Sequence, residues 1–302
     1  MATIAPRCRM SVKLAKQALL CTRPLSKKAA ACTRLGAVAA QRSLITVQDR
    51  LKSTNLGETT SKTDKATLSL FGVTDTLEGD KQKYSDALTQ AASAFHDAEQ
   101  IFNDPSFESK KGWSVDEKVD EDLRVYSKKT DKAVDMVAVT SVLLGHVDCV
   151  HLDVWTQPDD LKKWKKMVDH SCFVAQLTDH ADIIHGSTNS MLVSDGRDFV
   201  TARIWRKIGD SYIIASRSVD VGEEPYEGKV RGTVHLAACR LRPDPEDPKH
   251  KTLCDVIAHV DPKGNIPKAA VNMVCSKLAL MEAKAQKKHF EMLQGQGKLG
   301  KQ

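Results

Sequence analysis

The most constraining feature of this sequence is a succession of short apolar segments in its second half, which ends in one long amphipathic stretch. Six of these segments are strand-like in length and composition: Cys172–Leu177, Ala181–Val193, Asp198–Lys207, Ser211–Val219, Val230–Arg242 and Thr252–Val260. Residues typical of hairpin turns separate them, as at Ser194–Gly196, Gly209–Asp210 and the proline-rich stretch Arg242–Lys251. This pattern predicts a long antiparallel meander.

The long stretch after the meander predicts a helix over Pro267–Leu293. Pro267 suits the first turn of a helix, where its missing N–H costs nothing. Apolar residues recur on one side of this helix: Val271, Val274, Leu278 and Met281. Gly295 and Gly297 then end it. Because a sheet of this length curls, a helix across its concave side would enclose a cavity or a core.

The first half of the body predicts a mixed order of helices and strands. Tyr84–Asn103 has apolar residues at three- and four-residue spacing and ends at an Asn-Asp-Pro sequence, as an amphipathic helix does. Three extended pieces follow, at Gly112–Lys118, Leu123–Lys129 and Ala133–Val142. Val147–Trp155 and Asp160–Val168 are then expected as short helices broken by Pro158. The whole body, 83–294, is therefore expected to be one α+β domain with a flexible tail at 295–302.

The first 48 residues carry the basic character of the chain. They hold nine Lys and Arg residues and no Asp or Glu, whereas the remaining 36 basic and 39 acidic residues make the body slightly acidic. A cationic segment that is free of acids and rich in Ala, Ser and Thr predicts a mitochondrial targeting segment, disordered or cleaved; a disordered basic arm for an anionic surface is the alternative. Residues 49–82 are polar and are expected to form a linker, with Leu68–Val73 docking on the domain.

Several functional classes lack their sequence signals here. The eight cysteines form no Cys-x-x-Cys pair, which favours free thiols in a reducing compartment over a zinc site. His180 and His185 lie five apart, so on a strand they point to opposite faces and do not share a metal. No apolar stretch approaches the roughly 20 residues that cross a bilayer. No phosphate-binding loop or hydrolase motif occurs. The acidic body argues against a nucleic-acid partner.

Four motifs stand in an order that resembles a known family. Gly196–Arg203 reads GRDFVTAR, Gly228–Gly232 reads GKVRG, Val260–Lys268 reads VDPKGNIPK, and Trp164 follows the two short helices. In this order and spacing the motifs are similar to those of the START (StAR-related lipid-transfer) domain family, over about residues 83–294. With the basic leader, the chain most resembles the branch of mitochondrial cholesterol carriers.

The resemblance implies a helix-grip fold, in which a curved antiparallel sheet wraps a long C-terminal helix and encloses a hydrophobic tunnel for one lipid. It implies a carrier of a sterol, with neither enzymatic activity nor a cofactor, that meets membrane surfaces and the mitochondrial import machinery. We expect the protein at or in mitochondria, with a share in the cytoplasm. A phospholipid carrier, a lipid-sensing module without transfer, and an enzyme on the same scaffold are the alternatives.

The resemblance also assigns candidate site residues. The segment Val221–Gly228 corresponds to the mobile loop that gates the tunnel, with Val221, Gly222, Pro225, Tyr226 and Gly228 as its characteristic positions. Arg203 is expected to face the tunnel, but the acidic partner found in sterol-binding relatives would fall near Gly186. Asp182 or His185 replaces that acid through water, or Arg203 binds a phosphate head group. Other residues are expected either to line the tunnel or to belong to the core: Leu161, Met191, Met273, Val274, Leu278 and Met281.

Overall fold

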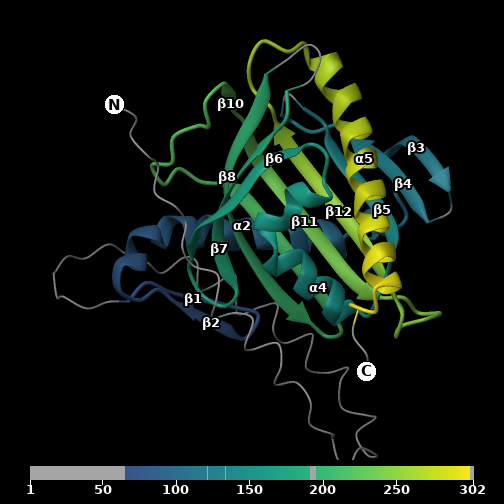
Figure 1. Cartoon of the computed structure of the whole chain (residues 1–302), viewed down its shortest axis with the longest axis horizontal. Coiled ribbons are helices and arrows are strands. Elements are labelled where there is room, and N and C mark those ends of the chain that lie inside the picture. The colour runs from purple at the N-terminus through teal and green to yellow at the C-terminus, as the bar shows by residue number, and fades with distance from the viewer. Residues whose placement is uncertain (1–64, 121, 133, 191–194, 300–302) are drawn as a thin grey trace, which may run out of the picture. The chain divides into compact units, whose positions relative to one another are not determined.

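The structure, a computed structural model, describes residues 65–299 apart from 121, 133 and 191–194. Within these residues one large sheet has the strand order β3-β4-β5-β12-β11-β9-β8-β7-β6, with every neighbour antiparallel (Figure 1). The short strand β10 pairs in parallel with the start of β8. The strands of this sheet are β3 (Ser114–Asp120), β4 (Leu123–Lys128), β5 (Met136–Leu144), β6 (Val168–Gln176), β7 (Ala181–Thr188), β8 (Gly196–Ile208), β9 (Ser211–Ser218), β10 (Lys229–Arg231), β11 (Thr233–Pro243) and β12 (Lys251–Asp261).

One face of the sheet, the α2 face, is covered by helix α2 (Ser85–Asn103), and the short helix α3 (Pro105–Glu108) follows it. Alanines along α2 let the helix backbone approach the sheet closely, while Phe95 and Phe102 fill the space between them and are completely buried. Their partners on β8 are the even-numbered residues Val200, Ala202 and Ile204. This close packing confirms the amphipathic helix predicted from the sequence.

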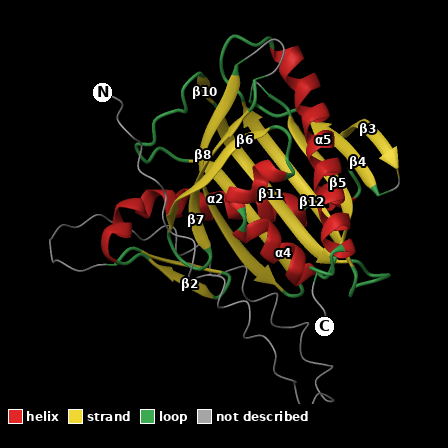
Figure 2. Ribbon diagram, viewed as in Figure 1, coloured by secondary structure: helices red, strands yellow, loops and turns green. Residues whose placement is uncertain are grey.

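The opposite face, the α5 face, carries helix α5 (Lys268–Gly295) and helix α4 (Val147–Thr156), both in front of the sheet in Figure 2. One side of α5 packs against β4 and β5 through Cys275, Ala279, Leu280 and Ala283. Further along α5, Phe290 is completely buried against α4 and the sheet. A large antiparallel sheet packed against a long C-terminal helix is the α+β helix-grip architecture that the sequence predicted.

The region between α4 and β6 differs from the expected helix over Asp160–Val168. The structure has only a six-residue 3-10 helix, η3 (Pro158–Lys163), and Val168 already begins strand β6. Pro158 starts η3 at a position where its missing N–H is harmless, and the segment is too polar to bury one side of a longer helix. The expected strand Ala181–Val193 likewise ends at Thr188, and its last residues lie outside the described part.

The folded part begins earlier than the expected boundary at residue 83. Strands β1 (Thr67–Leu70) and β2 (Val73–Thr76) form a hairpin, and the 3-10 helix η2 (Gly79–Tyr84) leads into α2. The hairpin completes the partners of Arg206, a completely buried arginine: its Nε donates to Leu70 O at 2.9 Å and its Nη2 pairs with Asp75. A buried guanidinium needs such partners, so the second half of the expected linker is part of the domain.

Residues 296–299, beyond α5, also pack against the domain, although they belong to the expected flexible tail at 295–302; its last three residues lie outside the described part. Leu299 contacts the cluster of Phe290 and Leu143, and Lys298 N donates to Leu293 O at 2.9 Å. Residues 1–64 lie outside the described part, so the targeting segment and the first half of the expected linker stay predictions.

Candidate functional site

Arg203 and Asp182 form a buried ion pair on the α5 face of the sheet. They stand directly opposite each other in the antiparallel pair of β7 and β8, so their side chains share one face. Arg203 Nε donates to Asp182 Oδ1 at 2.8 Å and Nη2 to Oδ2 at 2.6 Å, which is the bidentate geometry of a strong pair. The acid that the sequence lacks near Gly186 is thus replaced by Asp182, and the replacement is direct rather than through water.

Helix α4 covers this pair. Trp155 O accepts a hydrogen bond from Arg203 Nη2 at 3.1 Å, and the Trp155 ring centroid lies 4.4 Å from the Arg203 guanidinium carbon. Burial raises the pKa of the Asp182 carboxyl, and the positive charge of Arg203 opposes that shift. Trp155 was not among the predicted site residues, although its four-residue spacing from His151 places both on one side of α4.

Arg203 keeps one donor unused. Its Nε and Nη2 are bonded to Asp182 and Trp155, but Nη1 donates to no protein group among the described residues. By contrast Arg206 and Arg240, which are buried on the α2 face, donate from all three side-chain nitrogens. Nη1 is not one of the fully buried side-chain atoms that lack a partner, so it keeps some access to solvent in the free protein. Arg203 therefore offers a polar group for a ligand on the α5 face.

Several apolar side chains of the α5 face are packed less completely than those beneath α2. Within the described residues, several large apolar side chains of the α5 face belong to none of the three hydrophobic cores: Ile184, Phe199, Ile214, Val274 and Leu278. Four of them are only half-buried, and Ile214 is buried. Val274 and Leu278 precede Cys275 and Ala279 and so lie beside the stripe of α5 that packs on β4 and β5. This incompletely packed apolar surface, together with Arg203, defines the candidate site.

The other residues predicted to line the tunnel differ in how exposed they are. Leu161 in η3 is half-buried, as are Val274 and Leu278, whereas Met273 and Met281 are 58% and 37% exposed. Met191 lies outside the described residues. The predicted side of α5 therefore turns partly toward solvent.

His185 lies on the other face of the sheet from Arg203. It stands opposite Val200 in the pairing of β7 and β8, and Val200 belongs to the core beneath α2. Its Nε2 is 2.5 Å from Asp198 Oδ2, and its ring stacks on Tyr226 with 4.2 Å between centroids. His185 is thus a partner of the gating loop, and alternation along the strand keeps it away from Arg203.

The segment Val221–Gly228, which the sequence predicted to be the gating loop, is held at two of its five predicted positions. Val221 packs against the core beneath α2, and Tyr226 lies between His185 and His170, whose ring centroid is 4.9 Å away. The remaining positions are exposed: Gly222, Pro225 and Gly228. Gly222 and Gly228 have φ angles of 79° and 71°, which side-chain-bearing residues rarely adopt, so these ends of the loop require glycine.

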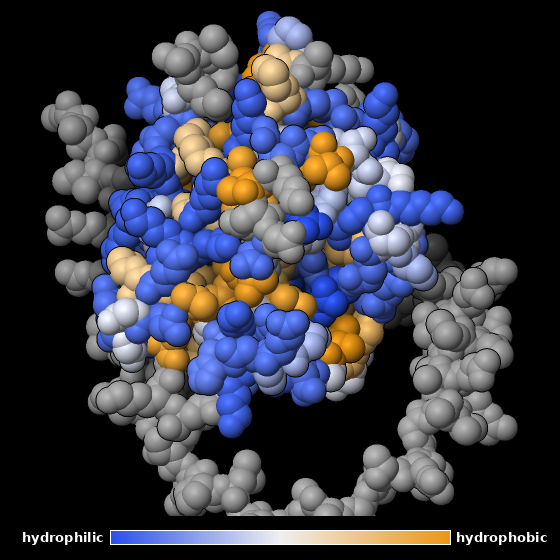
Figure 3. Space-filling model, turned by 90° about the vertical axis from the view of Figure 1, so that its right-hand side faces the viewer, coloured by the Kyte–Doolittle hydropathy of each residue, from blue (hydrophilic) through white to orange (hydrophobic). Residues whose placement is uncertain are grey.

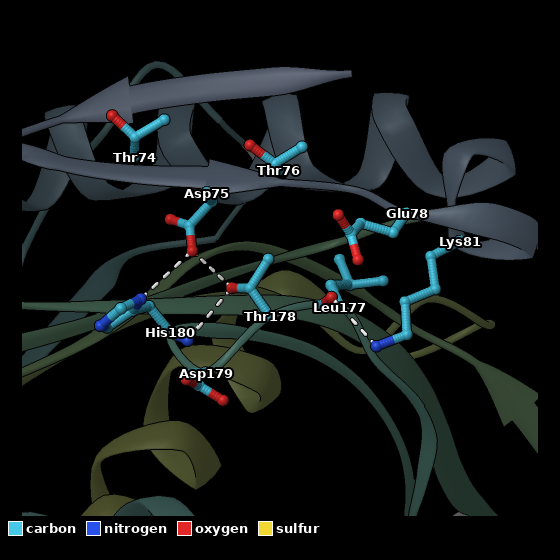
Figure 4. A pocket seen from close by; sticks show the side chains of 9 residues that line it. All are labelled: Thr74, Asp75, Thr76, Glu78, Lys81, Leu177, Thr178, Asp179 and His180. Carbon is cyan, nitrogen blue, oxygen red and sulfur yellow. Dashed lines mark hydrogen bonds and ion pairs between the residues drawn. The ribbon is translucent and has the colours of Figure 1, made fainter. Parts of the chain in front are cut away.

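A polar hollow lies elsewhere, between the β1–β2 hairpin and the turn from β6 to β7 (Figure 4). It has a volume of about 290 Å³, and hydroxyl and charged side chains dominate its lining. Asp75 at its base accepts a hydrogen bond from Thr178, lies 3.2 Å from His180 Nδ1 and pairs with Arg206. Because these groups already bond to one another, we assign the hollow to docking of the hairpin.

The outer surface next to α5 is mixed in character. On the side of the molecule that Figure 3 shows, hydrophobic residues form small patches between charged ones. None of the described helices is both long and apolar enough to span a membrane. Within the described part, no group of three or more His, Cys, Asp or Glu residues has an arrangement suited to a metal ion.

A large antiparallel sheet, one long closing helix, and the Arg203–Asp182 pair on the same face as half-buried apolar side chains define a helix-grip domain suited to a lipid. The START domain model matches residues 93–298. The steroidogenic acute regulatory-like protein 1 of Caenorhabditis elegans is 39% identical over 79% of this chain and 92% of its own length. The chain therefore belongs to the START-domain family of lipid-binding and lipid-transfer proteins, which are not enzymes.

A more distant sequence relative and a solved structure are also similar to this chain. The steroidogenic acute regulatory protein of Xenopus laevis is 26% identical over 57% of this chain and 61% of its own length. The solved structure of human StAR-related lipid transfer protein 5 superimposes with a TM-score of 0.61, covering 70% of this chain and 99% of that one at 20% identity. At this identity the superposition shows the shared fold alone.

Proposed function

We propose that this domain carries one sterol molecule, cholesterol in the first place, between α5 and the α5 face of the sheet, and moves it between membranes. The sterol body would cover the half-buried apolar side chains, and burying apolar surface gains roughly 25 cal/mol per Å². Its single hydroxyl would accept a hydrogen bond from Arg203 Nη1. Release and uptake would require the gating loop and α5 to separate at a membrane.

The observation that carries this proposal is the pairing of Arg203 with Asp182. A guanidinium bound to a carboxylate has no net charge left to neutralise, so its free N–H suits a neutral hydroxyl. A phosphate head group would instead bring a second negative charge next to the buried Asp182 carboxylate. The direct pair thus removes the reason for preferring a phospholipid, namely the acid missing near Gly186.

We further propose that the basic first 48 residues direct the protein to mitochondria, where the sterol is delivered. The proposal is supported by the absence of Asp and Glu from this segment. A reporter fused to residues 1–48 should accumulate in mitochondria, and replacing the nine basic residues by Gln should leave it in the cytoplasm. A mitochondrial full-length protein whose leader does not direct the reporter would contradict this assignment.

Ligand identity is tested by incubating the purified domain with vesicles of phosphatidylcholine, phosphatidylserine and cholesterol. The masses of the intact complexes are then measured by native mass spectrometry. We expect one added sterol mass per protein, and transfer of labelled cholesterol from donor to acceptor vesicles. The double variant Arg203→Met/Asp182→Leu removes the pair without leaving an unpaired charge, and it should lose the sterol mass. Arg217→Gln, a change on the α2 face, should keep it.

Two other results would redirect the assignment. An added phospholipid mass in place of sterol would identify a phospholipid carrier. A sterol mass without any vesicle-to-vesicle transfer would identify a lipid sensor.

A further inference from the structure

Two neighbouring residues of opposite charge, Arg197 and Asp198, begin the long strand β8. Because successive side chains of a strand point to opposite faces, Arg197 lies on the α5 face and Asp198 on the α2 face. Both are buried, Asp198 completely. Neither contacts the Arg203–Asp182 pair, yet both make more polar contacts than an ordinary strand residue.

Arg197 holds the turn that precedes α5. Its Nε donates to Pro262 O at 2.7 Å, its Nη2 donates to Lys263 O at 3.1 Å, and its Nη1 donates to Asp195 O. Lys263 and Gly264 both have positive φ angles, 55° and 76°, so the turn adopts a backbone conformation that costs free energy unless it is held. Arg197 thus fixes the start of the closing helix through carbonyl oxygens.

Asp198 holds the gating loop on the other face. Its carboxylate accepts hydrogen bonds from Tyr226 N at 3.2 Å, from Arg231 Nε and from His185 Nε2. Burial by itself would raise the pKa of Asp198, but these donors hold it below its ordinary value, so the carboxylate is charged at neutral pH. Its main-chain oxygen also accepts from Gly232 N at 2.9 Å, which fixes the segment where the chain leaves the loop.

We infer that Arg197 and Asp198 are positioning residues that couple the gating loop Val221–Gly228 to the start of α5, so that the two elements open and close together. The inference rests on the proposed function, in which these two elements form the gate. A shift of the strand at this dipeptide moves the side chains that bond to both elements at once. Loosening either element therefore frees the shared strand end and loosens the other.

The coupling is tested by hydrogen–deuterium exchange of the full chain without lipid. Arg197→Gln removes the charge-assisted bonds to the turn before α5, so exchange in residues 262–275 should rise about tenfold or more, as expected for the loss of hydrogen bonds to a charged group. The decisive readout is the gating loop: exchange in residues 221–231 should rise as well. Asp198→Asn removes the charge that holds the loop, so exchange should rise in the loop and, through the coupling, also in the turn.

A matched control distinguishes coupling from general destabilisation. Arg217 also donates to a main-chain oxygen, His235 O, and it pairs with Asp97 of α2, and none of its hydrogen bonds goes to residues 221–228 or to the turn before α5. Arg217→Gln should leave exchange in the loop and in the turn unchanged, and residues 251–260 should stay protected in all three variants. If Arg197→Gln and Asp198→Asn each accelerate exchange only in their own element, the coupling is refuted.

A transfer measurement separates this inference from the proposed function. With labelled cholesterol, both gate variants should exchange sterol faster than the unmodified chain and faster than Arg217→Gln. Coupled exchange without any sterol binding would retain the coupling and refute the sterol assignment. Sterol transfer with uncoupled exchange would do the opposite.

Discussion

On the α2 face the apolar side of α2 is buried against the sheet, with Phe95 and Phe102 completely buried, whereas on the α5 face Val274 and Leu278 of the closing helix remain half-buried. Two buried arginines, one from each face, also differ. Arg206 of the α2 face donates from every side-chain nitrogen, while Arg203 of the α5 face keeps Nη1 unused. The α5 face thus offers a half-buried apolar surface and one free side-chain donor that a single lipid would use.

The difference teaches where the sequence of a carrier must serve stability and where it must serve the ligand. A close-packed face gains most of its free energy from burial within the chain. A face that binds a ligand leaves part of its apolar surface unburied in the free protein, and the corresponding free energy is gained only on binding. Mutations on the two faces should therefore separate stability from lipid binding.

The largest loss of stability is expected when the N-terminal hairpin is removed. A chain that begins at Tyr84 leaves Arg206 buried without Asp75 and also loses the buried Leu70 and Leu77. Stranding one partner of a buried pair alone costs about 3–5 kcal/mol. Urea unfolding should show this chain destabilised by more than that amount relative to one that begins at Thr63. Equal stability of the two chains would mean that the hairpin is dispensable.

Phe95→Ala should give the next largest effect. The ring is completely buried between α2 and the sheet, so its loss should cost about 3–5 kcal/mol of unfolding free energy. Sterol affinity, measured at a temperature at which the variant is folded, should be unchanged. A strong loss of affinity in the folded variant would mean that the α2 face contributes to the site.

The pH dependence of stability should come largely from His151. Its ring lies between Tyr212 and Trp205, and burial lowers its pKa from 6.5 to about 4. Between these values the unfolded chain binds a proton that the folded protein excludes, so stability falls as the pH falls from 6.5 to 4, by about 3 kcal/mol. His151→Phe keeps the ring contacts without the titration. Unfolding at pH 4.5 and 7 should therefore show a flatter dependence, whereas an unaltered one would contradict the assignment.

Leu278→Ala should have the smallest effect on stability and a clear effect on lipid. Because the side chain is half-buried and outside the cores, less than about 1 kcal/mol of unfolding free energy should be lost. The loss of three carbons from the contact with a sterol should lower affinity about tenfold or more. Leu280→Ala, on the packed side of α5, is the matched control and should reverse this order.

Much of the fold could be predicted from the sequence, because alternation and turn residues mark β8 to β12 and apolar spacing marks α2 and α5. For the β1–β2 hairpin only the docking of Leu68–Val73 was predicted, because its fold depends on the pairing of Asp75 with Arg206, which are 131 positions apart. A contact between such distant residues leaves no local pattern.

The candidate site was predictable to a smaller extent. Arg203 was recognised by its motif, but its partner depends on the register of β7 against β8. The turn between these strands does not fix that register in sequence, so Asp182 was placed correctly only by the structure. Met281 followed the predicted periodicity, yet its exposure, like that of Met273, depends on how α5 is rotated against the sheet. Helical spacing alone does not determine that rotation.

The central claim is that a single sterol lies between α5 and the sheet and not on the α2 face. Photo-crosslinking with a diazirine-labelled cholesterol, followed by mass mapping of the modified peptides, tests it most directly. We predict adducts on the peptides that contain Ile184, Phe199, Ile214 and Leu278, and their loss in Arg203→Met/Asp182→Leu. Adducts on α2 or on scattered surface peptides, unaffected by that variant, would contradict it.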